Sequence, residues 1–135
     1  LGVYNKHPSH VNAVRGFLFP VCDDLMVVDW VAGGANLAPL AKGSGLRVSF
    51  LKLKESTCEE VKDKALSVVR GMEHGVGGVL RQFSCGENFS PERAKGFALA
   101  SLAVFPGLEE LESVELDEGL GMFVEDVVIV DYVVP

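Results

Sequence analysis

The sequence has little positive charge and no long apolar run. It contains 12 Lys and Arg against 19 Asp and Glu, which gives a net charge of −7 over 135 residues. A surface that binds nucleic acid needs clustered basic side chains, so this composition argues against a nucleic-acid partner. A membrane-spanning helix needs roughly 18–20 consecutive apolar residues, and no stretch approaches that length. We therefore expect neither a nucleic acid nor a membrane as a partner.

Cysteines are few and show no paired spacing. The three that occur, Cys22, Cys58 and Cys85, form no Cys-x-x-Cys motif. An odd number of cysteines favours free thiols in a reducing compartment. The acidic composition agrees with this, and we expect a cytoplasmic location.

Motifs for metals and cofactors are also lacking. The pair His7 and His10 in "HPSH" would supply only two ligands, fewer than a zinc site needs. The glycine-rich stretch His74–Val79 follows a predicted helix rather than a strand, which disfavours phosphate binding. We therefore expect no metal and no cofactor.

The most informative feature that the sequence does contain is a repeat. "DDLMVVDWVA", Asp23–Ala32, aligns with "EDVVIVDYVV", Glu125–Val134, at an offset of 102 residues. Aspartates coincide at two positions of this alignment, and Trp30 aligns with Tyr132. Both segments are rich in β-branched residues, which predicts that each forms a strand.

Hydrophobic periodicity orders the remaining chain. Leu46–Lys54 alternates as a strand does, and Ser56 with Glu59 forms a capping box for a helix that ends at Gly75. Later segments also have regular patterns: strands over 79–89, 97–105 and 127–134, with a helix that opens at Pro106. Residues 46–135 therefore have the order β-α-β-β-α-β. This order predicts an α+β, ferredoxin-like fold with a four-stranded antiparallel sheet.

The repeat also indicates the domain organisation. Residues 8–23 predict a helix that Pro20 bends or ends, and residues 25–31 predict a strand. Residues 1–32 are thus the last helix and strand of a first domain, 33–45 are a glycine-rich linker, and 46–135 are a complete second domain. The strand occurs twice because each domain ends with it. Since the chain begins with Leu1 rather than Met, we expect a fragment or a processed chain.

Several stretches, in this order, resemble the plant stress-responsive A/B barrel domain. They are "SFLKLKE", "GENFSPERAKGFALASLAVF" and "VVIVDYVVP", together with His7-Pro8-Ser9-His10 and Asp29-Trp30 in the first domain. The sequence is most similar to plant proteins that carry two such domains in tandem, over residues 4–32 and 46–135. It departs from the family because the first domain lacks its opening strands. The segment "LDEGLGMFVED" is also shorter than the helix that the family has there.

The resemblance implies a dimeric α-β barrel and roles in plant stress and defence. Family members pair two open sheets face to face, and the first domain here is incomplete, so we expect a homodimer through residues 46–135. The expected function is non-enzymatic, with a small apolar ligand in the barrel, lined by Phe50, Phe97, Leu99 and Tyr132. Some tandem relatives are associated with peroxisomes, which makes the peroxisome an alternative location.

The resemblance also implies an enzymatic alternative. The family includes a polyketide cyclase, which closes a ring by aldol-type chemistry with a Tyr six residues before the second His of its HPxH motif. Tyr4 and His10 match that spacing. A His can take a proton from an activated carbon, and a Tyr hydroxyl can stabilise the enolate oxygen. The cyclase has further histidines on its first and third strands, where this chain has Val48 and Leu99.

A third alternative is a protein-interaction module. The strand Leu25–Val31, separated from the rest of its domain, would present an unpaired edge that recruits a partner strand.

Overall fold

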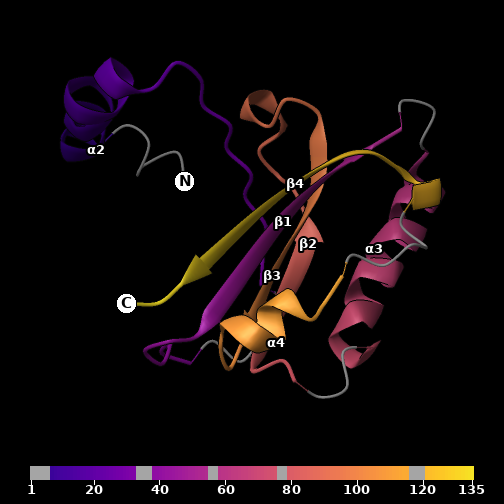
Figure 1. The fold of residues 1–135 in the computed structure, drawn as a ribbon. Helices are drawn as coiled ribbons and strands as arrows, with labels where there is room; N and C mark the ends of the chain where they lie inside the picture. The colour runs from indigo at the N-terminus through magenta and orange to yellow at the C-terminus, as the bar shows by residue number, and fades with distance from the viewer. Residues whose placement is uncertain (1–6, 33–37, 55–57, 76–78, 116–120) are drawn as a thin grey trace.

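The computed structural model describes residues 7–32, 38–54, 58–75, 79–115 and 121–135 (Figure 1). Its centre is a four-stranded sheet in the order β2-β3-β1-β4, and each neighbouring pair is antiparallel. The strands are β1 (Gly45–Leu53), β2 (Gln82–Glu87), β3 (Phe97–Phe105) and β4 (Val124–Val133). The predicted ferredoxin-like fold and its four strands are confirmed.

One face of the sheet is covered by helices. The long helix α3 (Glu59–Gly75) and the short α4 (Leu108–Glu112) lie on this side (Figure 1). The core between α3 and the sheet is formed by buried apolar residues, namely Leu51, Leu53, Ala65, Val69 and Leu99. The helix ends at Gly75 as predicted. Ser56 of the predicted capping box lies outside the described residues.

The strand registers assign side chains to the two faces. Leu51 pairs with Leu99 on β3 and with Val127 on β4, and all three pack at the α3 core. Because successive side chains point to opposite faces, Val48 and Phe50 lie on the face away from α3. We call this second face the open face.

The N-terminal helix begins as predicted and ends in stages. It consists of α2 (Pro8–Ala13), a π-helical turn (Val14–Leu18) and a short 3₁₀ turn (Phe19–Val21) that contains Pro20. The Nδ1 atom of His7 accepts a hydrogen bond from the backbone N–H of Ser9 and caps α2. Figure 1 shows α2 standing apart from the sheet. Two apolar side chains of this region are largely exposed, Phe17 at 81% and Val21 at 80%.

A bidentate ion pair ties β4 to β1. The Arg47 guanidinium donates to both carboxylate oxygens of Asp131, over 2.8 and 2.9 Å, and also to the backbone carbonyl of Val114. These hydrogen bonds hold the pKa of Asp131 below its usual value and raise the pKa of Arg47. One side chain thus connects two strands and the segment that follows α4.

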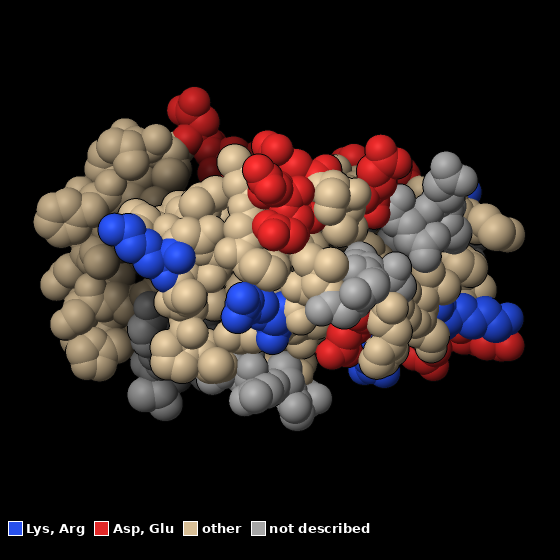
Figure 2. All heavy atoms as spheres, turned by 60° about the horizontal axis from the view of Figure 1, so that its bottom comes forward, with Lys and Arg blue, Asp and Glu red and all other residues tan. Residues whose placement is uncertain are grey.

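Basic side chains are scattered over the face that Figure 2 draws. Figure 2 shows the Lys and Arg side chains on one face separated from one another by acidic and uncharged residues. Among the described residues, no helix is long and apolar enough to cross a bilayer.

Candidate functional site

The open face of the sheet is the first candidate site, because it is apolar and no described helix packs on it. By register it carries side chains from three strands: Leu46, Val48, Phe50, Leu102, Val128, Val130 and Tyr132. Val130 is 50% exposed and Tyr132 is 56% exposed. Apolar surface of this kind is typical of a sheet that pairs with another element or encloses a ligand.

Two of the four predicted lining residues lie on this face. Phe50 pairs with Ala100 and Val128, while Tyr132 pairs with Leu46 at the other end of β1. The two rings are four strand positions apart, roughly 13 Å at about 3.3 Å per residue. A ligand in contact with both would have to be elongated.

The other two residues have different surroundings. Leu99 is fully buried on the α3 side, in contact with the helix core, so the prediction that it lines the open face is wrong. The physical reason is parity: Leu99 pairs with Leu51, and both point toward α3. Phe97 is 7% exposed at the start of β3, where the register shifts.

Of the predicted catalytic pair, the structure describes only His10. Tyr4 lies outside the described residues, and His10 is half-buried in α2. At the two strand positions that carry histidines in the related cyclase, Val48 is on the open face and Leu99 is in the core.

The second candidate site is the end of β2 and the loop that follows it, where residues 24–32 dock. We call residues 24–32 the cap segment. It is not a regular strand, but it runs beside β2 and the loop that follows β2. The Asp29 carbonyl accepts a hydrogen bond from the backbone N–H of Phe89 (3.0 Å), and the backbone N–H of Val27 donates to the carbonyl of Arg93 (2.9 Å). The backbone N–H of Asp29 donates to Oδ1 of Asn88 (3.0 Å).

This docking bears on the predicted strand at Leu25–Val31 in two ways. The segment forms no regular strand. On the side of Val27 and Asp29 its backbone is already bonded to Arg93 and Phe89, so that side is not an unpaired edge.

Trp30 is the central side chain of the cap segment. Its indole Nε1–H donates to the hydroxyl of Ser84 over 2.8 Å. Its Cβ lies where a side chain at Gly86 would point, since a Cβ built on Gly86 would be 3.1 Å from it. Ser84 and Gly86 pair with Leu102 and Ala100 on the open face. A glycine on β2 is therefore needed for Trp30 to reach the sheet.

An ion pair fixes the start of the cap segment. Lys95, in the turn before β3, donates to the Asp24 carboxylate, which also accepts from the backbone N–H of Leu25 (3.0 Å). The hydrogen bond from Lys95 is the main reason why the pKa of Asp24 is lowered below 3.8. The ion pair thus joins the loop that precedes β3 to the cap segment.

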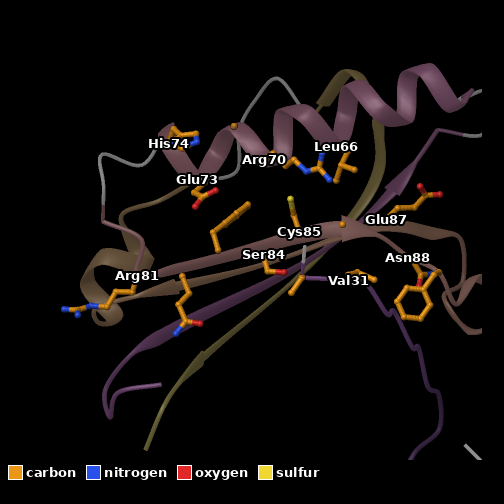
Figure 3. A pocket seen from close by; sticks show the side chains of 16 residues that line it. Val31, Leu66, Arg70, Glu73, His74, Arg81, Ser84, Cys85, Glu87 and Asn88 are labelled. Carbon is orange, nitrogen blue, oxygen red and sulfur yellow. The ribbon is translucent and has the colours of Figure 1, made fainter. Parts of the chain in front are cut away.

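A groove follows the outer edge of β2. It has a volume of about 1160 Å³ and lies between α3 and the end of the cap segment (Figure 3). Its lining mixes cationic, acidic and apolar side chains, including Leu66, Arg70, Glu73, Cys85 and Val31. Burial raises the pKa of the Cys85 thiol, and the nearby Arg70 guanidinium only partly opposes this shift. This thiol is thus a poor nucleophile at neutral pH.

Sequence analysis missed the three residues that receive the cap segment, Ser84, Gly86 and Asn88. A signal was present, because small or polar residues alternate at these positions of "SCGEN". Such alternation on a strand marks one face that is not packed by large apolar side chains.

The described ranges also hold no cluster of three or more His, Cys, Asp or Glu side chains suited to a metal ion.

Comparison of the sequence with known proteins gives two informative relatives in Arabidopsis thaliana, both described as stress-response A/B barrel domain-containing proteins. The first is 39% identical over 145 residues, and the second is 35% identical over 142 residues. Each alignment covers the whole of this chain, but only 54% of the first relative and 65% of the second. The chain therefore spans about half to two thirds of the length of these relatives.

Solved structures agree on the fold. A dimeric protein of unknown function with a ferredoxin-like fold from Bacteroides fragilis has a TM-score of 0.55 and 16% identity, covering 68% of this chain and 97% of its own. A hydroxynitrile lyase from Passiflora edulis has a TM-score of 0.56 and 13% identity, covering 70% of this chain and 96% of its own. At such identities the similarity shows the fold alone.

The family assignment rests on sequence. The family model described as Stress responsive A/B Barrel Domain matches residues 46–134, which include nearly all of the four-stranded sheet. The resemblance seen in the sequence is thereby confirmed, and the chain belongs to the stress-responsive A/B barrel domain family.

Proposed function

We propose that this protein is a binding member of its family rather than an enzyme. In this proposal two copies pair their open faces as a homodimer and enclose a small apolar ligand. The observation that carries it is the open face, where Phe50, Val128 and Tyr132 lie with no described helix above them. The dimeric description of the Bacteroides protein supports pairing, because that protein has the same fold.

The apolar lining favours binding over chemistry. Catalysis of proton transfer needs a titratable group within hydrogen-bond reach of the reacting atom. The side chains at the centre of the open face, such as Val48 and Phe50, offer none. A lining of this kind suits a ligand that is held by burial of apolar surface.

The test is a titration with the fluorescent probe 1-anilinonaphthalene-8-sulfonate, run beside light scattering across a concentration series. We expect Phe50→Ser to weaken probe binding about tenfold, because it removes a ring from the lining. The control is Met122→Gln, an exposed site at 75% that lies outside the sheet. Probe binding that is equal in wild type and Phe50→Ser would show that the open face is not the ligand site.

Catalysis by Tyr4 and His10 stays an alternative, because their spacing matches the cyclase of the family. The Passiflora lyase adds no residue-level support at 13% identity. Turnover of a polyketide-like substrate that is abolished by His10→Ala and by Tyr4→Phe would favour this alternative over ligand binding.

A further inference from the structure

The outer edge of β4 presents backbone groups in the same way as the cap segment does. Val134 exchanges two hydrogen bonds with the chain before β1: its N–H donates to Ser44 and its carbonyl accepts from Gly43, both over 2.9 Å. The backbone groups of successive strand residues point to alternate edges. The N–H and C=O of Asp131, three residues earlier, therefore point away from β1. The corresponding groups of Asp29, its partner in the sequence repeat, bind Asn88 and Phe89.

The cap segment and β4 also share local geometry. The Asp24 carboxylate accepts from the backbone N–H of the next residue over 3.0 Å, and the carboxylate of its repeat partner Asp126 does the same over 2.8 Å. Trp30 and Tyr132 are each an aromatic residue directly after the second aspartate of the repeat. The two segments are thus alike in sequence. They also share the hydrogen bond between the carboxylate of their first aspartate and the next backbone N–H.

We propose that the cap segment is an internal substitute for β4 of a second copy, and that the two compete for the same site, which Ser84, Gly86 and the loop residues 88–93 form. This inference rests on the proposed homodimer and describes its regulation. In the capped state this site on β2 and its loop is occupied by the chain's own residues 24–32. In the paired state β4 of a second copy takes that place, and the cap segment is released.

The groups on β2 and its loop suit either occupant. Lys95 can pair with Asp126 of a second copy as it pairs with Asp24. Asn88 and the Phe89 N–H can bind the outward backbone groups of Asp131. The Tyr132 hydroxyl can replace the indole N–H as a partner for Ser84. The carboxylate of Asp131 remains bound to Arg47 throughout, because only its backbone is needed at the new site.

Competition favours the capped state at low concentration. A segment tethered to its site has an effective concentration of the order of millimolar. The cap segment makes contacts similar to those that β4 of a second copy would make. A second copy at micromolar concentration must therefore displace a segment whose effective concentration is far higher than its own. Weakening the cap segment without altering β4 should strengthen the dimer.

The chain contains a direct reporter of this exchange, because Trp30 is its single tryptophan. We would follow tryptophan emission and light scattering together across a concentration series of the whole chain. The expected result is a red shift of the emission that rises in parallel with the dimer fraction, as Trp30 leaves Ser84 for water. A dimer that forms while the emission stays unshifted would overturn the proposal, since β2 would then still be capped.

Two variants separate this competition from general loosening of the fold. Trp30→Ala weakens the cap segment and leaves β2 able to accept β4, so the dimer Kd should fall at least about tenfold. Gly86→Val fills the space on β2 that either aromatic ring would occupy, so it should release the cap segment without forming a dimer. Circular dichroism of both variants confirms that the sheet is folded.

The outcomes distinguish this inference from the proposed function. A lower dimer Kd in both Trp30→Ala and Gly86→Val would indicate association through another surface and would overturn the proposed competition. An unchanged dimer Kd in Trp30→Ala, with probe binding still sensitive to Phe50→Ser, would overturn the competition alone. A stronger dimer in Trp30→Ala with no probe binding would support the competition and contradict the ligand.

Discussion

The Arg47 guanidinium binds both carboxylate oxygens of Asp131 across the β1–β4 pair, over 2.8 and 2.9 Å. The side chain of Arg47 is 18% exposed and that of Asp131 is 38% exposed. The pair is therefore shielded enough to contribute to stability, although water weakens it.

We expect Asp131→Asn to lower the free energy of unfolding by about 1–2 kcal/mol, since it removes the charge while keeping the shape. Urea denaturation measures the change. Glu125→Gln is the matched control, because Glu125 is an exposed carboxylate on the same strand. Equal unfolding midpoints for the two variants would show that the ion pair adds nothing.

Cap docking should depend on pH through Asp24. Lys95 lowers the pKa of this carboxyl below 3.8, so its contribution is present above that value and is lost as the pH falls through the lower folded value. We expect tryptophan emission to shift red below about pH 4, as this contribution is lost. In Asp24→Asn the emission should already be shifted at neutral pH, with a weaker change on acidification. Identical acid profiles for the two proteins would contradict a role for the ion pair.

The assignment of the two sheet faces predicts unequal costs for two truncations. Leu99→Ala should destabilise the protein by about 2–5 kcal/mol, because it leaves a cavity against α3. Tyr132→Ala should lower the free energy of unfolding far less, since Tyr132 is 56% exposed. Thermal unfolding of both variants checks this. A larger loss for Tyr132→Ala than for Leu99→Ala would mean that the faces are assigned the wrong way round.

Thiol reactivity should differ among the cysteines. Cys58 is exposed, whereas burial raises the pKa of Cys85 and reduces its thiolate fraction near pH 8. We expect 5,5′-dithiobis-(2-nitrobenzoic acid) to modify Cys58 first and Cys85 more slowly. Arg70→Gln should slow Cys85 further, because Arg70 opposes the rise in its pKa. Faster labelling of Cys85 in this variant would contradict that effect.

The sequence was sufficient to predict the order of the elements but not the orientation of the sheet. Strand β3 has the predicted bounds, Phe97–Phe105, because its apolar run is clearly limited by a turn and a proline. The faces were harder, since "VSFLKL" places apolar residues at both parities. When both faces of a sheet are apolar, alternation indicates which residues share a face but not which face meets the helix. This is why Leu99 was assigned to the wrong side.

The docking of the cap segment could not be predicted from local pattern. The β-rich composition of Leu25–Val31 predicted a strand, and the structure has no regular strand there. The position of the segment depends on the absence of a side chain at Gly86, far along the sequence, and on the Ser84 hydroxyl that meets Trp30. Such a fit is a tertiary property, which neither propensity nor periodicity records.

The separation of α2 from the sheet has a mechanical consequence. A force applied at the N-terminus would pass along α2 and load the cap segment before it reaches β1. The bonds at Asp29 and Trp30 join the edge strand β2 and its loop, whereas β1 lies between two neighbours at the centre of the sheet. The cap segment would therefore detach first, as a short length of slack chain, while the four strands remain under little tension.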